Sequence, residues 1–440
     1  MGWGMGWGMA QTSGGGGGSV RPHLISILLR VARQTRAAVA GPLEMAWRRL
    51  QMVRSSGATR LALQADYTAW RGDGVAAAKL WRELERQQPD CALWPVKIAQ
   101  VAKERGDLET AERVLLAARE RGLDDEKIEL DLLRCARLSR RSNTAVADAE
   151  AIVEDAAASA TKIYYAAFHL LTQNRLAAAR SGFLRVLEDR RHGALARGQL
   201  AAIDLVAARQ AQSRFDVPGR VSPVQNSVVV REPSSDTLVV GFTLPEGTLG
   251  LPLNAALAML SSTAVNALYL YDSQQVFHLA GTDRFGPGYQ AMIDGVRALA
   301  DDMGTRRLIT VGGSGTGYTA IRAGIDLKAD GALVFSPGTL MDPRSNPAVA
   351  RNAQTLHRLR ERALPMMTTL RPLVKDRTSC PQIEIFYGGA NLRDISHAGH
   401  LAGLPGVSLH AVPGFSRHDC LTEMARRGYR DLLKLFPASR

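Results

Sequence analysis

The sequence is poor in cysteine and in long apolar segments. Its 440 residues include four scattered cysteines, Cys91, Cys135, Cys380 and Cys420, and none of them forms a CxxC pair. So few thiols exclude a disulfide framework and favour a reducing compartment. No run of about eighteen apolar residues occurs, which argues against a membrane-spanning helix. We therefore expect a cytoplasmic protein.

Lysine is also scarce, although the chain is strongly basic. The formal net charge is +13, yet only eight of the 55 basic residues are lysines. Residues 21–60 hold eight arginines against a single acid, Glu44, so this segment carries over half of the excess charge. The rest of the chain is close to balanced. Because the excess charge is concentrated in this segment and the arginine bias is better explained by coding composition than by a binding code, we expect no nucleic-acid partner.

Metal-binding patterns are missing as well. There is no HExxH and no Cys/His pair at zinc spacing, and His397-x-x-His400 has no obvious third ligand. We expect no metal and no cofactor. Apolar residues make up 46% and charged residues 22%, which is the composition of a globular protein. The length favours two domains.

The first 57 residues divide into two segments. Residues 1–20 are a glycine-rich, low-complexity sequence without the basic and apolar regions of a secretory signal, and we interpret them as a disordered tail. Residues 21–57 have an amphipathic helical pattern rich in arginine and interrupted at Gly41-Pro42. This segment could cap the next domain or lie on an anionic membrane surface. We favour the cap.

A repeat of 34 residues follows. Gly72-Asp73 and Gly106-Asp107 are separated by this period. An alanine stands five positions after each glycine, and a large apolar residue, Trp81 or Leu115, stands nine positions after it. The period continues without the Gly-Asp turn, through Arg140 with Ala145 and Asn174 with Ala179. Residues 58–210 therefore resemble tetratricopeptide repeats, which implies a helical domain that holds a protein partner. A non-repetitive helical bundle is the alternative.

The chain changes character after residues 211–225, a segment with two prolines and a glycine that we interpret as a linker. Residues 226–440 alternate strand and helix patterns, which predicts an α/β domain with a doubly wound, mostly parallel sheet. The first two strands are close in sequence, so we expect them to form an antiparallel hairpin at one edge. The expected strands are 226–232, 237–243, 266–272, 306–313, 331–337, 381–389 and 407–414, and the expected helices are 288–303, 316–328, 346–363, 391–403 and 419–436.

The most informative segment is the glycine-rich turn after the strand at 306–313. A phosphate-binding P-loop needs a lysine where Tyr318 stands, and a dinucleotide fingerprint needs a glycine there. A nucleophile elbow fits better, because small residues surround Ser314 between a strand and a helix. Thr316 replaces the second glycine of the GxSxG pattern. The alternative is a purely structural role, in which the glycine-rich turn only lets the helix pack closely against the sheet.

A serine nucleophile needs a base and an acid to orient that base. Asp394 follows a late strand, and His418 precedes the last helix, where Asp419 is placed to cap the helix N-terminus. Two alternatives stay open: Asp394 could cap its own helix, and His418 could be a surface loop residue. Three other histidines compete for the role of base: His397, His400 and His410.

On these residues, the segment 225–440 resembles the α/β-hydrolase superfamily, in particular hydrolase-like modules attached to bacterial tetratricopeptide or surface-polysaccharide proteins. The resemblance implies a catalytic triad of Ser314, Asp394 and His418. It also implies oxyanion donors at the Gly315 amide and near Phe242 or Thr243. The activity implied is that of a serine hydrolase acting on an ester or related acyl bond, with an acylated saccharide as one candidate substrate. The alternative function is a non-catalytic scaffold or binding protein with a degenerate hydrolase-like domain.

Overall fold

A computed structural model describes residues 51–123, 125–139, 142–210, 226–263, 265–340, 369–375 and 380–436. Residues 51–440 belong to one compact unit. Several sequence-based interpretations lie outside the described residues: the tail, all but the end of the basic segment, the linker and the helix expected at 346–363. Among the described residues, none of the helices is long and apolar enough to span a bilayer.

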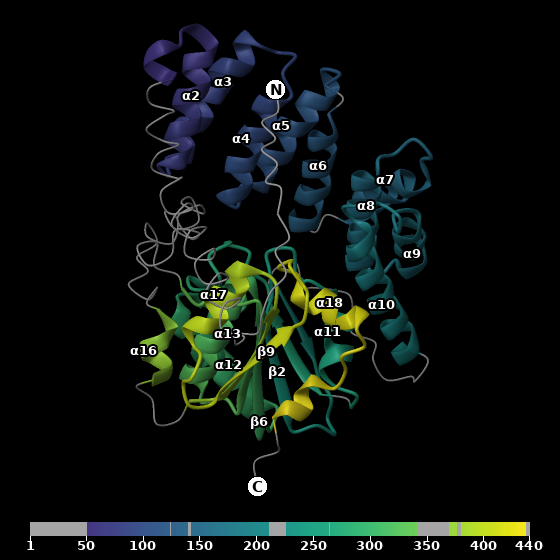
Figure 1. The fold of residues 1–440 in the computed structure, drawn as a ribbon, viewed down its shortest axis with the longest axis vertical. Coiled ribbons are helices and arrows are strands. Elements are labelled where there is room, and N and C mark those ends of the chain that lie inside the picture. Colours follow the sequence, from purple (N-terminus) through teal and green to yellow (C-terminus); the bar gives the residue numbers. More distant parts are fainter. Residues whose placement is uncertain are drawn as a thin grey trace, which may run out of the picture. The chain divides into compact units, whose positions relative to one another are not determined.

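The first part of the described chain is entirely helical (Figure 1). The aspartate of each Gly-Asp turn caps the helix that follows it, because its carboxylate accepts a hydrogen bond from an amide of the first turn: Asp73 from Ala76 N at 2.9 Å and Asp107 from Thr110 N at 3.0 Å. The nine helices of this part are α2 (Gly57–Trp70), α3 (Gly74–Gln87), α4 (Leu93–Glu104), α5 (Leu108–Glu120), α6 (Glu126–Ser139), α7 (Ser142–Glu154), α8 (Ala160–Thr172), α9 (Leu176–Arg185) and α10 (Gly193–Gln210).

The described residues of the 34-residue period occupy equivalent places in this region, whereas Arg140 and the side chain of Ala145 lie outside the described part of the chain. Gly72 and Gly106 have φ values of +96° and +78°, which a glycine adopts without strain. Asn174, one of the residues that tolerates this region, has φ +59° at the corresponding later turn. The alanines five positions after the two glycines, Ala77 and Ala111, are fully buried. The period therefore marks successive helix–turn–helix units.

The second part is a seven-stranded sheet in the order β1-β3-β2-β6-β7-β8-β9, parallel except for β1. All seven expected strands are present, which confirms an α/β arrangement. They are β1 (Ser227–Val230), β2 (Thr237–Phe242), β3 (Asn266–Leu270), β6 (Arg307–Gly313), β7 (Gly331–Phe335), β8 (Gln382–Gly388) and β9 (Val407–Val412). A separate two-stranded ribbon pairs β4 (Gly281–Thr282) with β5 (Gly286–Pro287).

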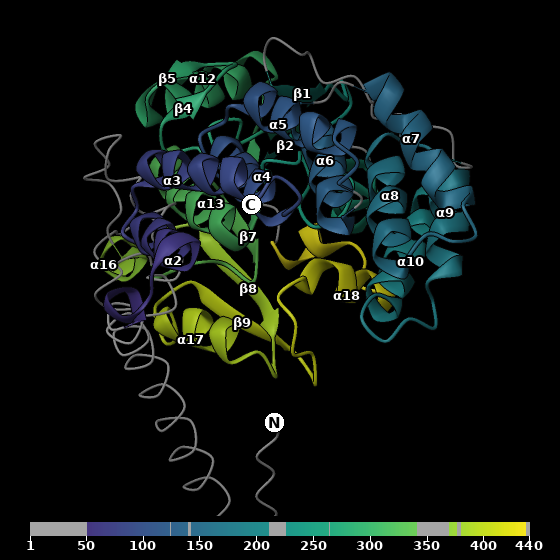
Figure 2. The same ribbon diagram turned by 90° about the horizontal axis from the view of Figure 1, so that it is seen from above.

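Helices cover both faces of the sheet (Figures 1 and 2). On one face, α12 (Tyr289–Asp302), α13 (Ser314–Leu327), α16 (Leu370–Lys375) and α17 (Leu392–His400) bury an apolar core against the strands. On the other face the core is formed by α10, α11 (Leu253–Leu260), α18 (Cys420–Arg426) and the short 3-10 helix η1 (Leu432–Leu435). The α/β sandwich thus includes a helix, α10, that the sequence analysis assigned to the repeat domain.

The expected edge hairpin is wrong. β1 does lie at the edge and is antiparallel, but its partner is β3, with Ser227 opposite Leu270. The reason is α11, a helix between β2 and β3 that the sequence analysis did not anticipate. This crossover makes β2 and β3 a parallel pair, so only the outer side of β3 remains for β1.

Candidate active site

Ser314 occupies a strained turn between β6 and α13. Its φ is +52°, a region that L-residues other than glycine seldom adopt. The neighbours must be small. A Cβ on Gly312 would lie 2.5 Å from the Thr316 carbonyl oxygen, and one on Gly317 would lie 2.7 Å from Pro337 Cβ. Close packing thus presents the Ser314 side chain at the end of the strand, as a nucleophile elbow does.

Thr316, the departure from the GxSxG pattern, is accommodated within the turn. Its fully buried hydroxyl donates to the Gly313 carbonyl oxygen at 2.9 Å and accepts from the Gly313 amide at 3.2 Å. A buried hydroxyl with both a donor and an acceptor partner bears no desolvation penalty for an unmade bond. The side chain therefore closes the turn beneath Ser314.

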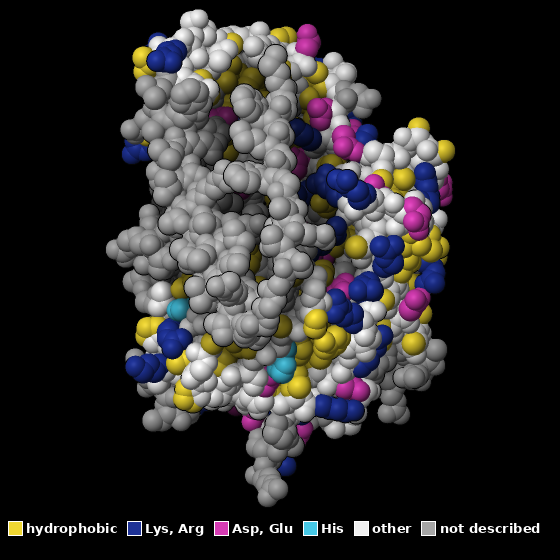
Figure 3. Space-filling view, in the orientation of Figure 1, with side chains coloured by type: hydrophobic (Ala, Val, Ile, Leu, Met, Phe, Trp, Pro, Cys, Tyr) yellow, Lys and Arg dark blue, Asp and Glu magenta, His cyan; other side chains and the backbone are white. Residues whose placement is uncertain are grey.

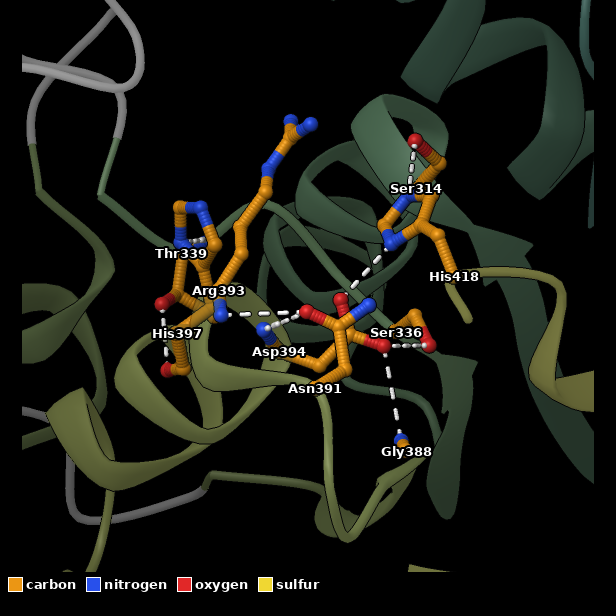
Figure 4. Close-up of polar contacts among 9 residues, drawn as sticks. All are labelled: Ser314, Ser336, Thr339, Gly388, Asn391, Arg393, Asp394, His397 and His418. Atoms are coloured by element: carbon orange, nitrogen blue, oxygen red, sulfur yellow. Dashed lines mark hydrogen bonds and ion pairs between the residues drawn. The ribbon is translucent and has the colours of Figure 1, made fainter. Parts of the chain in front are cut away.

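The structure brings Ser314, His418 and Asp394 together (Figure 4). His418 Nε2 lies 2.8 Å from Ser314 Oγ, and His418 Nδ1 lies 2.7 Å from Asp394 Oδ1. With the proton on Nδ1, the imidazole donates to the carboxylate and accepts from the serine hydroxyl. The Asp394 side chain is fully buried, whereas 36% of the His418 side chain is exposed. The acid is shielded and the base is accessible from solvent.

A second set of contacts holds Asp394. Ser336, which follows β7, donates its hydroxyl to Asp394 Oδ2 at 2.6 Å, and the Gly388 amide donates to the same oxygen at 3.4 Å. The cap of α17 is Asn391, whose side chain accepts from the amides of Arg393 and Asp394. Asp394 therefore does not cap its own helix. Sequence reasoning missed Ser336, whose only signal is a polar residue at the end of the strand beside the elbow.

The competing histidines have other contacts. His397 is buried on α17, where its Nδ1 accepts hydrogen bonds from the amides of Thr339 at 3.1 Å and Leu340 at 3.3 Å. Burial, assisted by the nearby positive charge of Arg393, lowers the pKa of His397 to about 4. His410 lies in β9, as expected, and contacts Glu384. Burial lowers the pKa of His400.

Asp419 occupies the N-cap position of α18, as the sequence analysis expected. Its side chain nevertheless makes no capping hydrogen bond. Burial raises the pKa of this carboxyl above its usual range, and the neighbouring Arg417 and His418 oppose that effect. The residue after His418 therefore starts the helix without capping it through its carboxylate.

The expected oxyanion donors are only partly retained. Gly315 lies in the first turn of α13, where backbone amides have no partner within the helix. The Thr243 amide, in contrast, already donates to the Leu270 carbonyl oxygen at 2.9 Å, so it is engaged in the backbone. Phe242 is the last residue of β2 and is buried, because β2 lies between β3 and β6 in the sheet. Gly315 is thus the donor that the geometry supports.

A loop that the sequence analysis did not identify packs against Gly315. The Asp272 carboxylate accepts hydrogen bonds from the amides of Val276, Phe277 and His278, and it holds Gln275, Phe277 and His278 at positive φ. The Phe277 ring lies so close that a Cβ on Gly315 would be 2.1 Å from Phe277 Cε1. The sequence gives no signal for this contact, since residues 277 and 315 are far apart along the chain.

Within the described part of the chain, no group of three or more His, Cys, Asp or Glu side chains could hold a metal ion. Comparisons with known proteins identify no family for this chain. No protein-family model matches the chain, and no curated protein is significantly similar to it.

Proposed function

We propose that the protein is a serine hydrolase of the α/β-hydrolase type that acts on an ester or related acyl bond. The observation that supports this most directly is the continuous hydrogen-bond chain from Ser314 Oγ through His418 to Asp394. Ser314 is at positive φ at the end of a parallel strand, which is the backbone geometry such a nucleophile needs.

The reaction follows from the positions of these atoms. Ser314 Oγ attacks the carbonyl carbon while its proton passes to His418 Nε2, and Asp394 stabilises the imidazolium through Nδ1. The Gly315 amide donates to the oxyanion of the tetrahedral intermediate. As the intermediate collapses, the alcohol leaves with the proton from His418 and an acyl-serine remains. Water then attacks the acyl-serine with His418 as base, which releases the acid and restores the serine.

A non-catalytic scaffold is the alternative, and it predicts an acid that points away from the imidazole. Asp394 instead faces His418 and receives two further hydrogen bonds on its other oxygen. A degenerate site would have no need to keep a buried carboxylate in this position, because an unpaired buried charge is costly. This contact favours a working site.

We also propose that the helical region, with its tetratricopeptide-like repeats, binds a protein partner. We propose further that the protein is cytoplasmic.

Turnover of p-nitrophenyl acetate tests the proposal. We expect Ser314→Ala and His418→Ala to lower kcat by at least about 1,000-fold. Ser181→Ala, on an exposed position of α9, is the matched control and should retain wild-type turnover. Hydrolysis that survives Ser314→Ala unchanged, in a protein with wild-type thermal stability, would refute the assignment of the nucleophile.

A further inference from the structure

A cavity of about 940 Å³ lies beside the candidate active site. Its walls come from helices α6, α8 and α10 of the helical region and from two segments of the α/β part, residues 244–250 and 417–422. This volume is at the upper end of the usual range for small-molecule sites. It exceeds what a short acyl group needs.

The cavity reaches the segment that carries the proposed catalytic base, although neither His418 nor Ser314 lines it. Arg417 and Asp419, the two residues that flank His418, both line it, and so does the loop that follows β2. The two parts of the chain are tied together around it. Gln199 Nε2 of α10 donates to the Gly250 carbonyl oxygen at 3.4 Å, and Arg417 donates to the Arg191 carbonyl oxygen at 3.0 Å. A substrate bound here would extend away from His418 toward the repeat helices.

Aromatic rings form one wall. Tyr164, Tyr165 and Phe168 are neighbours on α8 and all line the cavity. Tyr164 stacks on His192, with ring centroids 4.9 Å apart and an angle of 20° between the planes, and on Phe168, at 6.5 Å and 13°. Tyr165 and Phe168 are partly exposed. Flat aromatic faces of this kind pack against the C–H faces of sugar rings.

The charges of the lining are balanced. Four basic side chains, Lys127, Arg134, Arg191 and Arg417, are matched by four acidic ones, Glu126, Asp131, Glu246 and Asp419. Charges of both signs are also interspersed over the described residues on the face drawn in Figure 3. A polyanion would meet four carboxylates in this cavity, so a strongly anionic ligand does not suit it.

Hydrogen-bonding capacity is left over at the buried end of the cavity. Gln199 and His192 line it with exposed fractions of only 2% and 3%. Gln199 Oε1 and His192 Nδ1 have no hydrogen-bond partner among the described residues. Buried polar atoms are normally paired, so atoms of this kind favour a polar ligand or ordered water.

We propose that this cavity binds the saccharide portion of an O-acylated, uncharged carbohydrate, so that its ester reaches Ser314. The inference rests on the proposed function and adds the substrate class to it. A neutral saccharide combines apolar ring faces, which suit the wall of α8, with hydroxyl groups that donate to carboxylates and accept from arginines. The helical region thereby becomes part of the substrate site.

The test measures binding separately from catalysis. Full-length Ser314→Ala is applied to a glycan array that carries neutral and acidic oligosaccharides, each with and without O-acetyl groups. We expect binding to neutral acetylated glycans that is insensitive to salt between about 0.05 and 0.5 M, since no ion pair is formed. Adding Phe168→Ala or Tyr165→Ala should weaken binding about tenfold. Tyr67→Ala, a partly exposed tyrosine on α2 outside the cavity, is the control and should change nothing.

Three outcomes overturn the inference. One is an array without binding, measured on a protein whose wild-type form hydrolyses p-nitrophenyl acetate. Another is binding restricted to acidic glycans that weakens with salt, and the third is an equal loss of binding in Phe168→Ala and Tyr67→Ala. Glycan binding without any hydrolysis by wild type would contradict the proposed function and leave the saccharide site standing.

Discussion

At the scale of single residues, the site depends on one imidazole placed between two oxygens. The distances of 2.8 Å to Ser314 and 2.7 Å to Asp394 fix the ring, and Ser336 fixes the acid from behind. Ser336 touches no reacting atom in this arrangement. It is a positioning residue that keeps the carboxylate plane aligned with His418 Nδ1.

Removing the Ser336 hydroxyl should slow the chemistry without changing substrate binding. Ser336→Ala deletes a buried hydrogen bond to a charged group, which is worth about 1.5–3 kcal/mol. We expect kcat to fall about tenfold or more while KM stays within about twofold. Steady-state kinetics with p-nitrophenyl acetate measure both.

Ser336→Gly is the companion variant. Ser336 has φ +46°, so glycine relieves the backbone while it also removes the hydroxyl. A similar fall in kcat for both variants would assign the effect to the hydroxyl. Normal kcat in Ser336→Gly would show that the hydrogen bond is dispensable.

That Ser314, Asp394 and His418 lie together could be predicted, because the chemistry proposed for them is tied to chain order. A serine among glycines after a strand, an acid after a later strand and a histidine before the last helix are all visible in the sequence. Ser336, Phe277 and the engaged Thr243 amide could not be predicted. Their roles depend on which loops meet at the strand ends, and a single sequence does not contain that information.

At the scale of elements, the loop 272–278 determines the space above the Gly315 amide. Its shape comes from the Asp272 carboxylate, which accepts three backbone hydrogen bonds, and from the contact of Thr319 Oγ1 with the Phe277 carbonyl oxygen. The loop therefore presents the Phe277 ring to the start of α13 as part of a rigid turn.

Gly315→Ala should inactivate the protein through this contact. The added methyl would lie 2.1 Å from Phe277 Cε1, so either the ring or the Gly315 amide must move. We expect kcat/KM to fall about 100-fold, the usual effect of losing an oxyanion donor. The double variant Gly315→Ala/Phe277→Ala should recover about tenfold of that loss, because the methyl then has room. No recovery in the double variant would mean that the ring is not the cause.

The buried His397 on α17 should make stability depend on pH. The fold lowers its pKa to about 4, so between about pH 6.5 and pH 4 the unfolded chain binds a proton that the folded protein does not. The free energy of unfolding should therefore decrease as the pH is lowered through this window. The protonation of His397 accounts for about 3 kcal/mol of this decrease. Urea denaturation at pH 7 and pH 4.5 measures it.

His397→Gln is the comparison. Its free energy of unfolding should change by about 2 kcal/mol less between the two pH values than that of wild type. An identical change in both proteins would contradict the assignment to His397.

Most of the strands could be predicted from the sequence pattern, but the order in which they pair could not. The strands are apolar runs between turn residues, and the sheet expected from them is present. The pairing of β1 was mispredicted because proximity along the chain favoured β2, whereas the unanticipated α11 places β3 between them. Strand order depends on crossovers, which leave a weaker trace in the sequence than strands do.

At the scale of the whole molecule, α10 joins the two parts of the chain. Ala202, Leu205 and Val206 of this helix are buried in the same core as the sheet residues Val239 and Ile309. Sequence composition placed the domain boundary after this helix. The packing shows instead that the α/β sandwich is incomplete without it.

Gly198→Ala tests this joint. Alanine normally stabilises a helix relative to glycine by up to about 1 kcal/mol. Here its Cβ would lie 2.4 Å from Thr422 Cγ2 and 2.9 Å from the Thr422 carbonyl oxygen on α18, so we expect a net destabilisation of about 1–3 kcal/mol in chemical denaturation. Gly399→Ala on α17, which has nothing within 4 Å, is the matched control and should be neutral or stabilising. Equal effects of the two variants would rule out close packing of α10 on α18.

The central claim is that Ser314 is a nucleophile activated by His418. Labelling of the full-length protein with a fluorophosphonate, followed by intact-mass and peptide mass spectrometry, tests it most directly because the probe reacts with activated serines without needing the natural substrate. We predict a single adduct on the peptide that contains Ser314, none in Ser314→Ala, and strongly slowed labelling in His418→Ala. A folded wild-type protein that stays unlabelled, or carries its adduct on another serine, would contradict the account.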